Sequence, residues 1–280
     1  AAGRVRRAAP LGRALAVTLA AAGVAYLWFL AAWGFNYARP PLENRIGFAR
    51  ERVTPEAFEA LAREAVAACN RWHPDAHRAG FPAPGVTPRV LAAALNDVER
   101  ALGRPRPTVP GVPKVTLFAP FFRASGTDGM HVPWLLETLV NPWLTPPERP
   151  AVVAHEWAHL SGFAPEDDAS FVGLLAALRA DAASRYSAWL TLLVTATPGL
   201  GRDAGRAIVG GLDPGPRADW DAIIERLATR VALVERVSWK AYDRYLKSQG
   251  VAEGVQSYSR VVELMLGMDP SHDMYWRRTP

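Results

Sequence analysis

The stretch AHEWAHLSGFAPEDD, residues 154–168, decides how the rest of this chain is interpreted. It contains His155, Glu156 and His159 in the spacing His-Glu-x-x-His. Residues four apart lie on one face of an α-helix, so we expect both imidazoles to face one metal ion. Glu156 lies between them in angle, close enough to take a proton from water without binding the metal. The spacing therefore predicts a zinc site suited to hydrolysis.

The flanking residues fit a helix that ends just after this stretch. Residues 145–148, Thr-Pro-Pro-Glu, match a capping box, and Pro150 restricts the helix start to its own vicinity. Gly162 is placed where a helix ends on a left-handed residue. The apolar side consists of Val152, Val153, Trp157 and Leu160. The alternative interpretation is a surface helix that carries two solvated histidines.

A third protein ligand must come from outside the His-Glu-x-x-His spacing. Pro165 suits the first turn of a second helix, which places Glu166, Asp167 and Asp168 beside the end of the metal helix. Three acids at a helix start also complement the helix dipole without any metal. We predict Glu166 as the ligand, with Asp167 and Asp168 as alternatives.

The pattern from His155 to Phe171 resembles domain of unknown function 3810, a bacterial family of membrane-anchored, zincin-like proteins. Two C-terminal runs, residues 242–250 and 254–258, are similar to that family as well. The resemblance covers roughly residues 126–266. It implies a zincin-like fold and a membrane anchor.

Residues 166–170, Glu-Asp-Asp-Ala-Ser, are also similar to the Glu-x-x-Ala-Asp/Asn segment of membrane gluzincin peptidases. In those enzymes the leading Glu is the third zinc ligand, so this resemblance favours Glu166. Ser170 departs from the usual Asn or Asp, and Asp168 stands where Glu is common. These departures concern the outer groups that orient metal ligands.

An uncharged apolar run, residues 14–38, is long enough to cross a bilayer as a helix. Aromatic residues crowd its second half, as expected near one membrane interface. A cleaved signal peptide is the alternative, but the run is long and has no clear small-x-small cleavage site. We therefore predict a retained transmembrane helix.

The basic arm, residues 1–13, predicts the orientation of that helix. The arginines that flank the run are Arg4, Arg6, Arg7 and Arg13 before it and Arg39 and Arg45 after it. The positive-inside rule keeps the arm in the cytoplasm and places residues 39–280 outside. Four of the chain's 32 basic residues lie in the arm, against 27 acidic residues in the whole chain, so the remainder is nearly neutral. Nucleic-acid binding is therefore not expected.

Two further features lie before the metal helix. His73 and His77 are also four apart, but Pro74 disfavours a helical His73, so both are predicted to be loop residues. Cys69, the chain's one cysteine, lies on the apolar face of a helix that starts at residues 54–55. We expect it to be a buried structural thiol.

Two short strands are predicted, at residues 114–118 and 130–133. Pro133 restricts the second strand to a sheet edge. An edge strand shortly before a metal helix suits a peptidase, because an extended peptide can pair with its free backbone groups. His131 is expected either to line that cleft or, preferably, to be an ordinary exposed strand residue.

The chain downstream of the metal helix is predicted to be helical. Residues 165–197 carry a long apolar pattern, and 187–201 is uncharged but short for a membrane span, so it is expected to be buried or to lean on the membrane. Residues 201–217 are rich in Gly and Pro and suggest a mobile lid or a linker. Residues 219–247 predict one long helix, and residues 261–266 begin a last buried segment.

Together these features predict a mainly α protein with a small β-sheet, α+β and zincin-like, behind an N-terminal transmembrane helix. The expected function is membrane-anchored, zinc-dependent hydrolysis of a peptide or protein, with Zn²⁺ as cofactor. Tyr258, after a turn-prone Glu-Gly, is the candidate donor for the transition-state oxyanion. The alternatives are a membrane scaffold or binding protein with a structural zinc, and a zinc hydrolase of a non-peptide substrate. The oligomeric state is left open.

Overall fold

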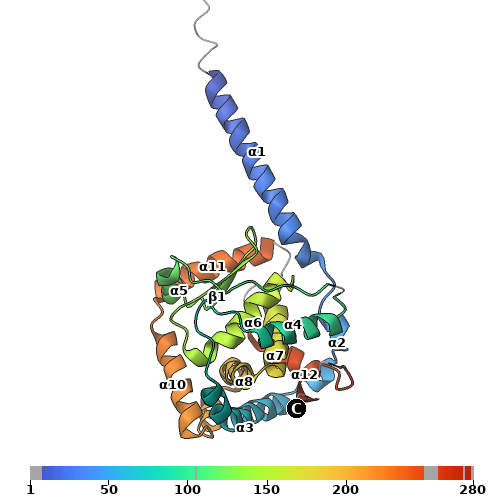
Figure 1. The fold of residues 1–280 in the computed structure, drawn as a ribbon, viewed down its shortest axis with the longest axis vertical. Helices are drawn as coiled ribbons and strands as arrows, with labels where there is room; N and C mark the ends of the chain where they lie inside the picture. The colour runs from blue at the N-terminus through green and yellow to red at the C-terminus, as the bar shows by residue number, and fades with distance from the viewer. Residues whose placement is uncertain (1–7, 105, 249–257, 274, 279–280) are drawn as a thin grey trace, which may run out of the picture.

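The computed structural model describes residues 8–104, 106–248, 258–273 and 275–278 (Figure 1). Helix α1 (Ala8–Ala32) projects as a rod from a helical body. Its segment Gly12–Ala32 is 21 residues of high hydropathy, long and apolar enough to cross a membrane. The α-helix ends at Ala32, before the predicted end at residue 38, and a 3₁₀ helix over Gly34–Ala38 carries the chain onto the body.

Within the described residues, the body consists of helices around one short hairpin. The helices are α2 (Glu43–Ile46), α3 (Pro55–Ala79), α4 (Arg89–Ala101), α5 (Ala119–Ser125), α6 (Arg149–Leu160), α7 (Glu166–Arg179), α8 (Ala182–Ala196), α9 (Arg202–Val209), α10 (Pro214–Ala228), α11 (Ala232–Ser248) and α12 (Tyr258–Gly267). The strands are β1 (Gly129–Val132) and β2 (Glu137–Val140). This mainly helical architecture with a small sheet confirms the coarse prediction of the fold class.

Strand β1 pairs with β2 in antiparallel register, with Gly129 opposite Val140. On its other side β2 meets Lys114 through an isolated parallel bridge to Leu139. The predicted strand over residues 114–118 is therefore wrong beyond its first residue. Thr116 ends it, because its hydroxyl and carbonyl oxygens accept the next backbone N–H groups in a turn.

The core is built from long helices packed in pairs, with α3 against α8 and α6 against α7. Helix α6 lies deep in the body, and its Trp157 is fully buried. Gly173 on α7 allows the second pair to pack closely, because a Cβ there would lie 2.8 Å from the backbone nitrogen of His155. Helix α8 is buried against α3, so residues 187–196 belong to the core of the body.

Three of the predicted helical segments are divided differently in the structure. The expected 165–197 helix breaks at Asp181, whose side chain caps α8 by accepting the N–H of Ser184 at 2.8 Å. The predicted lid or linker, residues 201–217, contains α9 and the start of α10. The expected 219–247 helix is interrupted because the N–H of Val231 bonds the carbonyl oxygen of Ala124 on α5 at 2.9 Å.

The prediction that His73 and His77 are loop residues is also wrong. Helix α3 continues through Pro74 to Ala79, and both histidines lie on it. Proline removes one backbone hydrogen bond and disfavours the helix locally, but packing of α3 along α8 outweighs that cost. Thr54 caps the helix at its start, and Cys69 is fully buried, as expected.

Candidate metal centre

A capping box starts the helix that carries the motif. Thr145 and Glu148 satisfy each other's backbone groups, and the short Pro146–Glu148 turn leads directly into α6. The Glu148 carboxylate also accepts hydrogen bonds from the guanidinium of Arg226 on α10. Arg226 donates to Asp128 as well, at 2.9 Å, so one partly buried cation ties α10 to the start of α6 and to the segment before β1.

The end of α6 places the next acidic residue beside the motif. Gly162 follows the helix with φ of 83°, a left-handed conformation that suits glycine. The N–H of Phe163 then bonds the carbonyl oxygen of Ala158 at 3.1 Å, which reverses the chain. Helix α7 begins at Glu166, so its first side chain returns to the face of α6 that carries the histidines.

Two histidines and one carboxylate meet at this turn. The Nε2 atom of His155 lies 3.3 Å from Oε2 of Glu166, and Nε2 of His159 lies 3.3 Å from Oε1. One possible ligand atom from each of the three residues lies within 4.8 Å of the other two. Ligand atoms bound tetrahedrally at zinc distances lie about 3.3 Å apart. The donor set and its separations therefore fit a zinc ion.

Both imidazoles are oriented by hydrogen bonds on their other ring nitrogen. Nδ1 of His155 lies 3.0 Å from the Ser170 hydroxyl, and Nδ1 of His159 lies 2.9 Å from the carbonyl oxygen of Phe163. A carbonyl only accepts, so His159 carries a proton on Nδ1, and loss of a proton from Nε2 would free that atom to bind a metal. Ser170, which departs from the gluzincin pattern, still supplies an outer partner of the kind that orients metal-binding histidines.

Glu156 lies beside the cluster but is not one of its three members. It is 3 % exposed, and its Oε2 has no hydrogen-bond partner among the described residues. Burial raises the pKa of Glu156 to about 7, although His155 and His159 oppose the shift. Gly129 leaves room for the carboxylate, because a Cβ there would lie 2.5 Å from Oε1.

The charges in the cluster shift the pKa values of its members in opposite directions. Burial lowers the pKa of His159, but the carboxylates of Glu166 and Glu156 outweigh that effect and raise it to about 9. Burial would raise the pKa of Glu166, yet the two histidines hold it well below its usual value. Without metal, the carboxylate of Glu166 thus favours a protonated His159, and a bound cation would replace that proton.

The end of the apolar helix forms one wall of the centre. Trp33 is buried, with its ring centroid 4.8 Å from that of His131 and 5.7 Å from that of His159. His131 itself is only 8 % exposed, so the preferred expectation of an exposed strand residue is wrong. Burial, helped by His159, lowers the pKa of His131 to about 4, which keeps its ring neutral.

A tyrosine that no sequence pattern predicted reaches the cluster from α11. The hydroxyl of Tyr242 donates a hydrogen bond to Oε1 of Glu166. Burial, followed by the charge of Glu166, raises the pKa of this phenol. Tyr242 does lie in one of the C-terminal runs that resemble the family, but no local pattern linked it to the motif. Tyr258 is the first residue of α12, and its side chain lies outside the described residues, so its role stays a prediction.

The two other acids of the α7 start are not part of the cluster. Asp167 lies 3.9 Å from the guanidinium of Arg260 on α12. Burial raises the pKa of Asp168 to about 7, and Asp167 adds to the shift. Of the three candidates for the third ligand, Glu166 alone joins His155 and His159 in a group of metal-binding spacing within the described part of the chain.

The fold and the site define a class of protein: mainly helical, with an apolar N-terminal helix and a His, His, Glu cluster on its central helices. The chain belongs to the family described as "Protein of unknown function (DUF3810)", which matches residues 2–266. The expected membership of that family is thereby confirmed, and the zincin-like character stays a prediction. No curated protein and no solved structure matches the chain.

Proposed function

We propose that this chain is a membrane-anchored, zinc-dependent peptidase whose active site lies beside the membrane surface. The observation that carries the proposal is the position of Glu156. A zinc ion held only for structure needs ligands, whereas hydrolysis also needs a carboxylate beside the ligands that does not bind the metal. Glu156 is buried next to His155 and His159 and lies outside the three-residue cluster.

A zinc ion bound by His155, His159 and Glu166 would supply the Lewis acidity that polarises a scissile carbonyl. Glu156 acts as the general base that takes a proton from the attacking water, and it then returns that proton to the leaving amine. Its raised pKa suits both steps near neutral pH. Tyr242 acts as a positioning residue, because its hydroxyl bonds the Glu166 carboxylate and limits its rotation.

The hairpin next to the cluster offers a place for an extended peptide. Lys114 takes the outer edge of β2 by bonding the backbone of Thr138 and Val140. Alternation along an antiparallel ladder then turns the backbone N–H and C=O of Gly129 and His131 away from β2. A peptide that pairs with those groups runs past Glu156, which touches Gly129. This arrangement favours peptides over small non-peptide substrates.

The site is reachable from solvent on one side. The side chain of His155 is 22 % exposed and that of Glu166 is 30 % exposed, whereas His159 and Glu156 are buried. A zinc ion in this position would keep the partly open face that a catalytic metal needs and a closed structural site lacks.

Helix α1 supports membrane anchoring rather than removal as a signal sequence. Phe29 and Trp33, at its last turn and just beyond, are buried together with Ala164 of the segment that links α6 to α7. Removing α1 would therefore expose the metal centre and delete one of its walls. With the basic arm in the cytoplasm, as the positive-inside rule favours, the body lies on the opposite side of the membrane.

The proposal is tested with the full chain purified in detergent and loaded with zinc. A denatured-protein and peptide library is digested, and the cleaved bonds are identified by mass spectrometry. We expect cleavage by the wild type and by Glu59→Gln, an exposed change on α3, and loss of cleavage in Glu156→Gln. If the zinc-loaded wild type and Glu156→Gln gave the same set of cleaved bonds, the proposal would be overturned in favour of a structural metal or a non-peptide substrate.

A further inference from the structure

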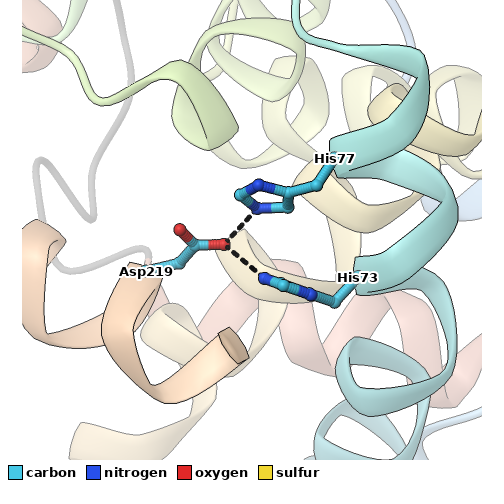
Figure 2. Close-up of side chains that lie close together, drawn as sticks. All are labelled: His73, His77 and Asp219. Atoms are coloured by element: carbon cyan, nitrogen blue, oxygen red, sulfur yellow. Dashed lines mark hydrogen bonds and ion pairs between the residues drawn. The ribbon is translucent and has the colours of Figure 1, made fainter. Parts of the chain in front are cut away.

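A second cluster of metal-binding side chains lies between α3 and α10 (Figure 2). His73 and His77 are one turn apart on α3, and Asp219 faces them from α10. Nε2 of His77 lies 2.8 Å from Oδ2 of Asp219, and Nε2 of His73 lies 3.6 Å from the same oxygen. One possible ligand atom from each residue lies within 4.8 Å of the other two.

We propose that His73, His77 and Asp219 form a second metal site that binds one divalent transition-metal ion, with zinc as the best match. Two imidazoles and one carboxylate suit zinc and its first-row neighbours, whereas magnesium and calcium require mostly oxygen ligands. Separations of 2.8 and 3.6 Å bracket the value of about 3.3 Å between tetrahedral zinc ligands. The imidazole of His77 is partly exposed, which leaves access for a water molecule as fourth ligand.

The two helices are fixed in register at this point by a neighbouring amide. The side chain of Asn70, one turn before His73, donates to the carbonyl oxygen of Gly211 at 2.9 Å. It also accepts the backbone N–H of Asp213, the residue before α10, at 2.9 Å. Asp219 is therefore presented to α3 by a backbone that is held independently of any metal, as a preorganised site requires.

The carboxylate has an outer partner of the kind that metal ligands commonly have. The hydroxyl of Tyr186, a fully buried residue of α8, donates to Oδ2 of Asp219 at 2.6 Å. This bond orients the carboxylate toward the two histidines. The ring of Tyr186 also contacts His73, with centroids 5.5 Å apart, so one residue supports two of the three ligands.

A glycine makes space for one of the imidazoles. A Cβ on Gly215, in the first turn of α10, would lie 2.4 Å from Cε1 and 2.8 Å from Nε2 of His73. Alanine at this position would move the ring without changing any ligand atom.

The competing interpretation is a metal-free staple in which Tyr186 and His77 only hydrogen-bond the carboxylate of Asp219. The two interpretations differ in zinc content and in the effect of Asp219→Asn. Asparagine keeps a hydrogen-bonding oxygen but loses the negative charge that strengthens zinc binding, so a staple tolerates the change better than a zinc site does.

The test counts zinc in the full chain after equilibration with zinc and removal of weakly bound ions. In a His155→Ala/His159→Ala background, we expect about one zinc per chain to remain, as for one three-ligand site. Adding His73→Gln and His77→Gln should remove it. Asp221→Asn, an exposed change on α10 two residues from Asp219, is the control and should keep it. An equal zinc content with and without the two Gln substitutions would overturn the proposal.

If the variant with four substitutions folds poorly, zinc affinity measured in single variants tests the same proposal. The α3 cluster is His73, His77 and Asp219. In the wild-type background, its zinc affinity should fall at least tenfold in Asp219→Asn and in Gly215→Ala. In Tyr186→Phe it should fall 10- to 100-fold, as is typical for the loss of an outer partner. A zinc affinity that none of the three changes alters would identify a metal-free staple. Because the α6 histidines are absent from the first test, failure of the proposed peptidase activity would leave its outcome unaffected.

Discussion

The α6 cluster (His155, His159 and Glu166) and the α3 cluster (His73, His77 and Asp219) have the same arrangement of ligands but different surroundings. In each, two histidines four residues apart face a carboxylate from another helix. In α6 the residue after the first histidine is Glu156, which lies beside the metal-binding atoms. In α3 the same position is Pro74, which cannot accept a proton. Ligand spacing alone therefore predicts metal binding, whereas hydrolysis depends on the residue between the ligands.

The surroundings of the two clusters also suit only the α6 cluster to hydrolysis. The α6 cluster lies next to β1, whose outward backbone groups can pair with a peptide, and beneath the buried end of α1. The α3 cluster joins two helices at the side of the body away from α1 (Figure 1). The first arrangement would present a substrate to the proposed zinc ion, whereas the second would fix α10 against α3.

The largest expected effect separates the two clusters by their general base. Glu156→Gln should lower peptide cleavage by about 10²- to 10⁴-fold, because glutamine cannot take the proton of water. Zinc content should remain unchanged, as measured by metal analysis. Adding Pro74→Glu to that variant creates His-Glu-x-x-His in α3 and should not restore cleavage. Restored cleavage would show that the substrate edge beside α6 is dispensable.

The next effect concerns the carboxylate that completes the α6 cluster. Glu166→Ala should weaken zinc binding there by more than ~100-fold, which exceeds the usual cost of losing an outer partner. Asp167→Ala and Asp168→Ala should each weaken it less, since neither carboxylate joins the cluster. Competition with a chelator in an Asp219→Asn background measures the α6 cluster alone. If Asp168→Ala proved most damaging, Glu166 would revert to a helix-dipole partner.

A smaller effect tests whether the unusual outer partner is functional. Ser170→Ala removes the hydroxyl that lies 3.0 Å from Nδ1 of His155. We expect zinc affinity of the α6 cluster to fall about 10- to 100-fold, as is typical for such partners. Ser170→Asn restores the residue common in gluzincins and should recover at least part of the loss. An unchanged affinity in Ser170→Ala would mean that packing alone orients His155.

The smallest expected effect is a pH dependence of peptide cleavage that comes from Glu156 and that zinc binding at the α3 cluster should lack. Burial raises the pKa of Glu156 to about 7, and only its carboxylate form acts as a base. A bound cation favours the carboxylate, so kcat/KM should decline as pH falls through about 7 or somewhat below, by about tenfold per unit. Zinc binding at the α3 cluster should not depend on Glu156. Zinc titrations of the wild type and of Glu156→Gln check this. A pH-independent kcat/KM between pH 5 and pH 7 would argue against this base.

The parts of the centre that were predictable are those encoded by neighbouring residues. The capping box at Thr145 and Glu148, the turn at Gly162 and the return of Glu166 to the α6 face all follow from residues within a few positions of the motif. These features depend on local backbone chemistry, which sequence pattern describes well.

The remaining parts depend on contacts between distant segments. Trp33 and Tyr242 reach the cluster from positions more than 70 residues away from it, and no local pattern specifies such contacts. Strand β2 was missed because the hairpin turn places Leu136 at φ of 53°, where a glycine or asparagine would have signalled a turn. For Pro74, the local rule was correct about its cost, and the packing of α3 on α8 outweighed it.

The burial of Phe29 and Trp33 fixes the distance between the proposed active site and the apolar helix α1. Enzymes tethered by long flexible linkers sample a volume set by the linker, which lowers their effective concentration at any one point. Here the short Gly34–Ala38 segment joins α1 to the body, and the end of α1 is itself packed on the site, so the linker has no slack. With α1 in a bilayer, the site moves only sideways with its anchor. As the proposed peptidase, it would meet peptide bonds at one distance from the lipid, in a two-dimensional search among membrane-bound substrates.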